Sequence, residues 1–350
     1  MNDDGNQKPP RRVRYRGTHP RRFEQRYKEL SGDAATHEHV RAAGRTPAGT
    51  HVPIMVAQSM QSLAPAAGEI VIDCTLGYGG HAMEFARRIG PGGRLIGLDV
   101  DAAQLQRTRE RLAGLQTPLS LHCMNFAGVG KVLALEGIEG ADIIFADLGV
   151  SSMQLDDPAR GFSYKHDGPL DMRMSERLKA TAADWLMRLS EEDISDALRD
   201  LGDEADHQRI AALIVQRRAA SPLTRTGELA ELVLEAKGLD RRAWRQETSS
   251  KRPPHPAAQT FQTLRMLVND ELGCLRELLR AAPYCLRAGG RMGILTFHSG
   301  EDRLVKHAFK EGLATDLYSQ ISDEVIRPTP AEVNSNPRSR PAKFRWAVKN

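Results

Sequence analysis

The sequence predicts an α/β fold in which a doubly wound, mostly parallel sheet is interrupted by an all-helical insertion. Short apolar runs alternate with helical patterns over residues 69–146, which is typical of parallel strands joined by crossover helices. Residues 158–255 then show amphipathic helical spacing and no convincing strand. The alternation resumes after residue 256, so the sheet domain is expected to be discontinuous in sequence.

The sheet domain is predicted to comprise residues 45–157 and 256–350. We expect strands at 69–73, 94–99, 119–123 and 142–146, with helices at 52–63, 80–89 and 102–112. Gly90-Pro91 ends the second of these helices, because neither residue favours a helix interior. After the insertion we expect one long helix over 259–282, a strand over 291–297 that follows the Gly289-Gly290 turn, a helix from about 301 and a last strand at 344–348.

The insertion, residues 158–255, is predicted to be an all-helical domain. Apolar residues recur at helical spacing over 182–189, 191–201, 210–214 and 229–236. Ser190 is a good N-cap for the second of these helices, and Gly238 ends the last. A proline-rich basic linker, 248–260, leads back to the sheet domain.

Composition excludes several classes of protein. No apolar run approaches the length of a membrane span, and the polar N-terminus lacks the apolar core of a secretory signal. The four cysteines form no C-x-x-C pair and have no metal-ligand spacing. We therefore expect a cytoplasmic protein with reduced thiols, no bound metal and no membrane association.

Positive charge is concentrated at the N-terminus. Residues 1–30 hold nine Lys or Arg and four Asp or Glu, although the whole chain carries a net charge of only +4. Few aliphatic residues are present, so residues 1–44 are predicted to be a disordered basic arm. The arm would either contact nucleic-acid phosphates or serve as a solubilising tail, and its composition favours neither role.

The glycine-rich stretch VIDCTLGYGGHA, residues 71–82, is the first candidate for a binding site. Gly77, Gly79 and Ala82 match the G-x-G-x-x-[G/A] pattern, and Asp99 follows Gly79 by 20 residues. Glycines let the backbone approach a ligand closely, and an acid at the end of the second strand can accept hydrogen bonds from ribose hydroxyls. NAD and S-adenosylmethionine share both requirements.

Two further acids favour S-adenosylmethionine. Asp73 directly precedes the glycine turn, where its carboxylate would repel a pyrophosphate but suits a ligand that bears an ammonium and a sulfonium. Asp147 ends the fourth strand, in the crevice where open α/β sheets bind ligands. Capping of neighbouring turns is the alternative role for Asp73 and Asp147.

Six motifs together are similar to the bacterial ribosomal RNA small subunit methyltransferase H family. They are DCTLGYGGHA (73–82), ADLGVSSMQLDDPARGFSYKHDGPLDMRMS (146–175), PLTRTGELAE (222–231), HPAAQTFQTLRMLVNDEL (255–272), FHSGEDRLVK (297–306) and NPRSRPAKFR (336–345). The resemblance runs from about residue 51 to the C-terminus and leaves out the basic arm. It implies a Rossmann-like class I methyltransferase sheet and S-adenosylmethionine-dependent methylation of the N4 amine of a cytosine in 16S ribosomal RNA.

The resemblance also implies roles for individual residues. Those implied for cofactor binding are Gly79, Gly80 and His81 in the turn, Asp99 on the ribose, Phe126 near the adenine, and Asp147 and Gln154 after the fourth strand. Three residues depart from the usual family pattern: Cys74 stands in place of Gly, Gln259 in place of Arg, and Gly300 in place of a bulky residue. None of these departures removes an expected cofactor residue.

Methylation of an exocyclic amine requires orientation of the nitrogen rather than covalent catalysis. The amine lone pair is delocalised into the base, so the enzyme must position the nitrogen and accept its hydrogens. Asp147, or the carbonyl groups of 148–150, is placed for this. His298, at the end of the strand 291–297 and beside Glu301 and Asp302, is a second catalytic candidate, although those two acids can simply favour a helix N-terminus.

Seven residues are candidates for contact with 16S ribosomal RNA, which we expect to be bound within the small ribosomal subunit. They are Arg173, Lys251, Arg252, His255, Arg303, Arg338 and Arg340. Arg173 has an alternative role as the partner of Asp171. For the whole chain, an NAD-dependent oxidoreductase and a non-catalytic ribosome assembly factor remain the alternative functions.

Overall fold

The computed structural model describes residues 53–239 and 255–350. The expected basic arm, most of the linker 248–260, and the candidates Lys251 and Arg252 lie outside these residues. In the described part of the chain, no helix has the length and apolar character needed to cross a membrane. The four cysteines, all of which are described, are free thiols.

Seven strands of the described chain form one sheet, in the order β3-β2-β1-β4-β5-β7-β6. The strands are β1 (Ile70–Asp73), β2 (Arg94–Asp99), β3 (Leu119–Cys123), β4 (Ala141–Asp147), β5 (Leu286–Thr296), β6 (Tyr318–Ile321) and β7 (Lys343–Lys349). The first five are parallel, and β7 pairs antiparallel with β5 and with β6. The predicted mostly parallel sheet is therefore confirmed.

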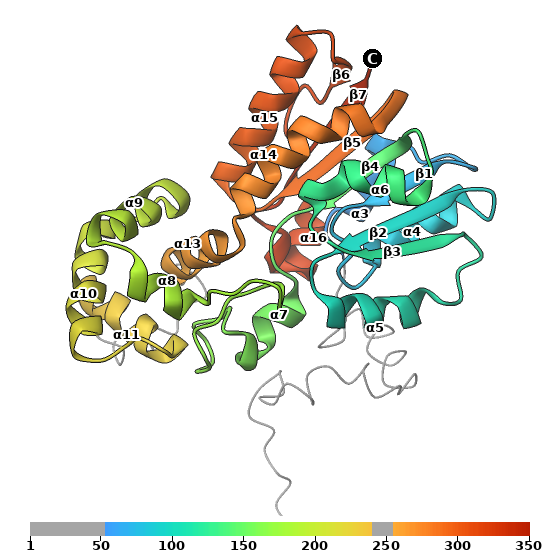
Figure 1. The fold of residues 1–350 in the computed structure, drawn as a ribbon. Coiled ribbons are helices and arrows are strands. Elements are labelled where there is room, and N and C mark those ends of the chain that lie inside the picture. The colour runs from blue at the N-terminus through green and yellow to red at the C-terminus, as the bar shows by residue number, and fades with distance from the viewer. Residues whose placement is uncertain (1–52, 240–254) are drawn as a thin grey trace, which may run out of the picture. The chain divides into compact units, whose positions relative to one another are not determined.

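Helices cover both faces of the sheet (Figure 1). One face packs against α6 (Val129–Glu136), α14 (Glu271–Ala281) and α15 (Ser299–Ala314), and the other against α3 (Val56–Leu63), α4 (Gly80–Ile89) and α5 (Ala102–Leu112). Alternate strand residues supply the two cores, because successive side chains of a strand point to opposite faces. Thus Ile144 belongs to the first core, and Ile143 and Phe145 belong to the second.

Between β4 and β5, the described residues form helices and no strand. The main helices are α8 (Ala182–Arg188), α9 (Glu191–Gly202), α10 (His207–Ala220), α11 (Thr226–Ala236) and α13 (Ala258–Asn269), preceded by α7 (Ser152–Asp156). They enclose a core of their own, which includes Leu186, Ile194, Ile214 and Leu264. As predicted, Ser190 caps α9, where its hydroxyl accepts the Asp193 N–H at 3.1 Å. As predicted, the insertion is all-helical over its described residues.

The prediction of a single helix over 259–282 is wrong. Asp270 adopts a left-handed conformation, with φ at 47°, and separates α13 from α14. Aspartate tolerates this conformation better than most residues, so a break is possible here without glycine. The apolar spacing remains helical on both sides of the break, so the sequence pattern does not reveal it.

The predicted turn at Gly289-Gly290 is also wrong, because β5 starts at Leu286 and runs through both glycines. A Cβ on Gly290 would lie 2.8 Å from the Arg287 carbonyl oxygen, and the register with β4 shifts nearby. The glycines therefore mark a close backbone approach within a strand rather than its beginning. The predictions also omitted α6 and β6.

Candidate active site

The glycine turn between β1 and α4 is held by groups from the second strand and the helix after it. Gly77 and Gly79 both have positive φ, at 48° and 76°, which favours glycine. The Gly77 N–H donates to Asp99 Oδ2 at 2.8 Å, and the Thr108 hydroxyl donates to the Gly77 carbonyl at 2.5 Å. At Gly80 a Cβ would lie 2.8 Å from Pro53, so no larger side chain fits there without a shift.

Three carboxyl groups meet at the carboxyl ends of neighbouring strands. Asp73, Asp99 and Asp147 end β1, β2 and β4. The strand order reverses between β1 and β4, and this switch point is where open α/β sheets bind ligands. The structure thus brings together the three acids that the sequence singled out.

Burial makes these carboxyl groups reluctant to ionise. It raises the pKa of Asp73 to about 7, and the nearby charge of Asp99 adds to the rise. Burial together with the charges of Asp73 and Glu301 raises the pKa of Asp147 to about 8. The pKa of Asp99 rises to about 6 through burial, although backbone N–H groups favour its ionised form.

A cationic ligand would relieve this cluster. Within residues 53–239 and 255–350, no ion pair brings a lysine or arginine to Asp73, Asp99 or Asp147, and the nearest partner is His81, whose Nδ1 lies 3.6 Å from Asp147 Oδ2. Largely buried carboxylates without a cation are costly, so a bound positive charge suits the site. The donor set therefore fits the ammonium and sulfonium of S-adenosylmethionine and disfavours a pyrophosphate.

The capping alternative for the acids is partly correct. Asp73 accepts the Thr75 N–H at 3.1 Å, and Asp99 accepts the Asp101 N–H at 2.9 Å in addition to that of Gly77. For the Asp147 carboxyl, by contrast, the described residues supply only the 3.6 Å approach of His81. Asp147 thus keeps the most hydrogen-bonding capacity for a ligand.

His81 is buried at the start of α4 beside Asp147. Its Nε2 lies 3.0 Å from the Ile54 carbonyl oxygen and donates to it, which turns the Nδ1 edge toward Asp147. The ring also packs against Phe145, with centroids 4.6 Å apart. The raised pKa of Asp147 favours a protonated carboxyl beside this ring.

Gln154 and Phe126 lie in the elements that follow β4 and β3. Gln154 belongs to α7, where its side-chain oxygen accepts the Ser151 N–H at 3.0 Å and its amide nitrogen lies 3.4 Å from Asp101 Oδ2. Phe126 begins a short 3-10 helix after β3 and is partly buried against the sheet core. Both residues lie in elements that follow the carboxyl ends of strands, as expected for residues that border this crevice.

His298 has a structural role at the start of α15. Its Nδ1 accepts the Glu301 N–H at 3.3 Å, while Glu301 Oε2 accepts the Phe297 N–H at 2.9 Å. Its Nε2 lies 3.0 Å from Glu301 Oε1 without the alignment of a hydrogen bond. Asp302 instead pairs with Lys343 and Arg345, so it is not available beside His298. A catalytic role for His298 stays a prediction.

Comparisons with known proteins match nearly the whole chain. The model of the MraW methylase family covers residues 48–350. A relative from Lachnoclostridium phytofermentans, named ribosomal RNA small subunit methyltransferase H 1, is 41% identical over 98% of this chain and 94% of its own. A second, from Acidothermus cellulolyticus and named ribosomal RNA small subunit methyltransferase H, is 42% identical over 87% of this chain and 94% of its own.

The chain belongs to the MraW methylase family. The family resemblance drawn from the motifs is therefore confirmed. Among solved structures, an rRNA methylase from Streptococcus thermophilus matches with a TM-score of 0.39 at 11% identity and covers 86% of this chain and 99% of its own.

In this member of the MraW methylase family, three of the RNA candidates are engaged in contacts within the chain. Arg173 forms a two-pronged ion pair with Asp171, with Nε and Nη2 each 2.7 Å from a carboxylate oxygen, which is the alternative role considered for it. Arg338 Nη2 lies 3.3 Å from Asp156 Oδ1. His255 stacks on Tyr164, with ring centroids 4.3 Å apart.

Arg303 and Arg340 lie at the surface. Contact of these five residues with RNA stays a prediction. In the part of the chain that is described, no group of three or more His, Cys, Asp or Glu is arranged to hold a metal ion.

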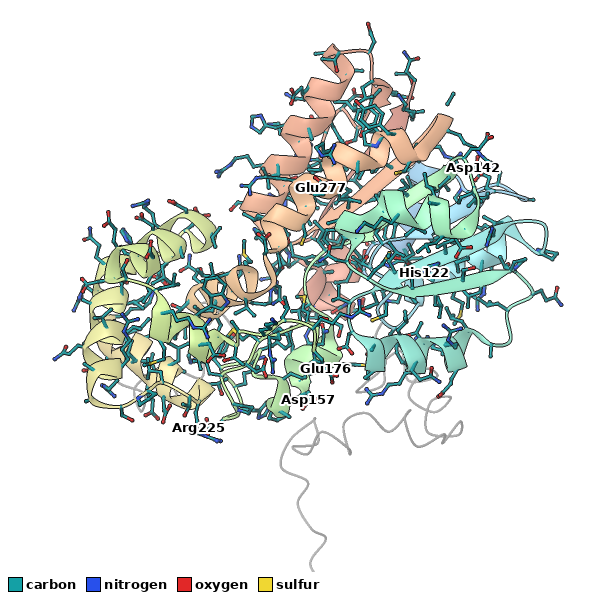
Figure 2. All side chains as sticks on the ribbon, viewed as in Figure 1. His122, Asp142, Asp157, Glu176, Arg225 and Glu277 are labelled. Atoms are coloured by element: carbon teal, nitrogen blue, oxygen red, sulfur yellow. The ribbon has the colours of Figure 1, made fainter. Side chains whose placement is uncertain are left out.

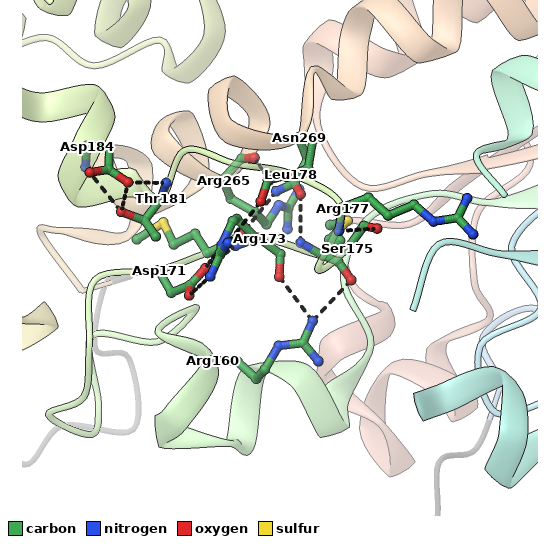
Figure 3. Close-up of polar contacts among 12 residues, drawn as sticks. Arg160, Asp171, Arg173, Ser175, Arg177, Leu178, Thr181, Asp184, Arg265 and Asn269 are labelled. Atoms are coloured by element: carbon green, nitrogen blue, oxygen red, sulfur yellow. Dashed lines mark hydrogen bonds and ion pairs between the residues drawn. The ribbon is translucent and has the colours of Figure 1, made fainter. Parts of the chain in front are cut away.

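Two polar residues of this region were missed by sequence reasoning. Arg160 Nη1 donates to Asp101 Oδ2 at 2.6 Å. Its Nη2 donates to the carbonyls of Arg173 and Met174, as Figure 3 shows. Asn269 contacts the same segment from α13. The sequence feature that could have identified them is their position within the motifs 146–175 and 255–272. The local residue pattern does not distinguish them from surface residues.

Proposed function

We propose that this chain transfers the methyl group of S-adenosylmethionine directly to the exocyclic N4 amine of a cytosine in 16S ribosomal RNA. Membership of the MraW methylase family over residues 48–350 is the observation that carries the proposal. The names of its relatives supply the substrate class, because they are ribosomal RNA small subunit methyltransferases.

The residues of the crevice fit this cofactor. Asp99 would accept the ribose hydroxyls, as the acid at the end of β2. Asp73 and Asp147 would face its positive charges, and the glycine turn would allow close backbone approach. The cofactor supplies an electrophilic methyl group, and the chain has to bind it, exclude water and orient the amine.

Asp147 is the group best placed to act on the target amine. Its carboxyl lies at the end of β4, 20% exposed, and it has His81 as a neighbour. Once ionised, it would accept a hydrogen bond from the N4 amine and so turn the nitrogen lone pair toward the methyl group. The proton that the amine loses would then be held at the Asp147 carboxyl, in contact with His81.

The helical insertion, residues 158–255, would recognise the RNA and hold the target base outside its stack. Its position in the chain, directly after β4, supports this assignment. Arg303 and Arg340, which are exposed, would contact phosphates near the same edge of the sheet. The assembled small subunit in the cytoplasm is the proposed substrate, and His298 the proposed second contact to the base.

Methyl transfer from labelled S-adenosylmethionine to unmodified small ribosomal subunits tests the proposal. We expect N4-methylcytidine in the nucleosides, identified by mass spectrometry, and a loss of rate of about 100-fold for Asp147→Asn, because general base action contributes at least that much. Asp142→Asn is the matched control. Asp142 lies at the other end of β4 and pairs with Arg287, so this variant keeps the wild-type rate (Figure 2).

The outcomes separate the alternatives. Methylation at another atom would correct the substrate while keeping the reaction class. Binding of NAD in place of S-adenosylmethionine would favour the oxidoreductase, and a cellular role that survives Asp147→Asn would favour the assembly factor.

A further inference from the structure

Arg160 joins three parts of the chain that are distant in sequence. It is the last residue of the 3-10 helix Pro158–Arg160. One guanidinium nitrogen donates to Asp101 Oδ2 at 2.6 Å. Another donates to the carbonyls of Arg173 and Met174 at 3.0 and 3.1 Å, as Figure 3 shows. The planar guanidinium makes these contacts at once because its N–H groups point in fixed directions.

The Asp101 end of this connection leads to the cofactor site. Asp101 caps α5, and its side chain is 8% exposed. Its backbone N–H donates to Asp99 Oδ1 at 2.9 Å, and its Oδ2 also lies 3.4 Å from the amide nitrogen of Gln154. Arg160 is therefore one ion pair away from two residues of the crevice.

The other end leads to the segment 172–174. Met172 is fully buried and has φ at 63°, a conformation that is strained for a residue with a side chain. Its N–H donates to the Arg160 carbonyl at 3.0 Å. Asn269, at the end of α13, holds the other side, with Nδ2 2.8 Å from the Met172 carbonyl and Oδ1 2.8 Å from the Met174 nitrogen.

The segment in turn fixes the start of the helical insertion. The Ala182 N–H, in the first turn of α8, donates to the Asp171 carbonyl at 2.7 Å. The contacts thus run without a gap from Asp99, through Asp101 and Arg160, to the residues that precede α8.

We propose that Arg160 is a positioning residue that couples occupation of the cofactor site to the conformation of segment 172–174. The inference rests on the proposed function for the identity of the cofactor. A ligand that fixes the positions of Asp99 and Gln154 also restrains Asp101. The ion pair and hydrogen bonds of Arg160 then restrain the segment in turn. Because such coupling is reciprocal, the ordered segment strengthens cofactor binding and prepares the insertion for RNA.

Hydrogen–deuterium exchange with S-adenosylhomocysteine as the probe tests the coupling without RNA. In the wild-type chain we expect the probe to slow exchange of the Met172 and Met174 amides. Arg160→Gln should abolish this slowing and weaken binding about tenfold in calorimetry, within the range typical of coupled sites. Arg160→Lys keeps the charge beside Asp101 but loses the forked contacts, so it should bind more tightly than the Gln variant and still show no slowing.

Arg225→Gln is the matched control. Arg225 Nη2 lies 2.6 Å from Asp167 Oδ2, both side chains are about half exposed, and the pair belongs to the same loop region. Figure 2 places Arg225 near α11, away from the sheet. This variant should bind the probe and slow exchange as the wild type does.

Three results would overturn the coupling. The first is wild-type affinity and wild-type slowing of exchange in Arg160→Gln. The second is a wild-type chain that binds the probe without any slowing of exchange at 172–174. The third is full slowing of exchange in Arg160→Lys, and this variant decides the matter if circular dichroism shows that Arg160→Gln does not fold. Failure of the wild-type chain to bind the probe would instead overturn the proposed function, together with the coupling that depends on it.

Discussion

Two effects act on each carboxyl group at the strand ends: its own burial and repulsion from a neighbouring acid. Asp73 and Asp147 lie at the ends of adjacent strands, and the charge of Asp73 raises the cost of ionising Asp147, as that of Asp99 does for Asp73. A cation lowers that cost. The site therefore holds acidic groups whose negative charge a bound cation would neutralise.

The pH dependence follows from the sign of these shifts. The pKa values of Asp73, Asp99 and Asp147 rise from an ordinary 3.8 to about 7, 6 and 8, so between pH 4 and 8 the folded chain holds protons that the unfolded chain has lost. The stability contributed by these protons is complete at low pH and is lost as pH rises toward 8. The expected fall is about 1.4 kcal/mol per pH unit for each extra proton, measured by urea unfolding.

Ligand affinity should show the opposite trend. S-adenosylmethionine carries a sulfonium charge that S-adenosylhomocysteine lacks, so the ratio of their affinities should increase in favour of the former between pH 6 and 8.5 as the acids ionise. Calorimetry at several pH values measures this ratio. A constant ratio in the wild-type chain would contradict the cationic role of the site.

At the scale of elements, two glycines allow the loop after β4 to pack backbone against backbone. A Cβ on Gly168 would lie 1.9 Å from the Pro158 carbonyl oxygen, and one on Gly161 would lie 2.1 Å from that of Pro169. This close approach places Arg160 between Asp101 and the segment 172–174.

Gly168→Ala should therefore lower the free energy of unfolding by about 3 kcal/mol, the upper part of the usual range for overpacking, because backbone atoms must move. Gly114→Ala is the control, since a Cβ there meets no atom within 4 Å, and it should change stability by less than about 0.5 kcal/mol. Thermal and urea unfolding measure both. Equal effects of the two substitutions would show that the loop relaxes freely.

At the scale of the molecule, the described residues form separate apolar cores, two on the sheet faces and one within the insertion. Polar contacts connect the insertion to the sheet, among them Arg160 with Asp101 and Ser299 with Asp203. Because the insertion and the sheet have separate apolar cores, local unfolding of one is expected to leave the other intact.

Ile214→Ala, in the core of the insertion, should cost about 3 kcal/mol locally and raise amide exchange in α9, α10 and α11, while exchange in β1 and β4 stays unchanged. Ile144→Ala makes a similar deletion in the sheet core and should show the reverse pattern. Exchange that rises uniformly along the chain in both variants would mean that the cores unfold as one.

The sequence by itself determined the local features of this protein. Strand and helix periodicity, the glycine turn and the acids at strand ends depend on residues close in the chain, and their positions agree with the structure, as Asp73, Asp99 and Asp147 show. The motifs likewise identified the family, because they extend in order over both parts of the sheet.

The tertiary structure alone decided what depends on distant residues. It ended α13 at Asn269, so that this side chain meets Met172 and Met174, and it placed Arg160 beside Asp101, 59 residues earlier in the chain. It also carried β5 through a glycine pair that resembles a turn. Local propensity cannot specify such features, because their stability comes from contacts between segments that only the folded chain brings together.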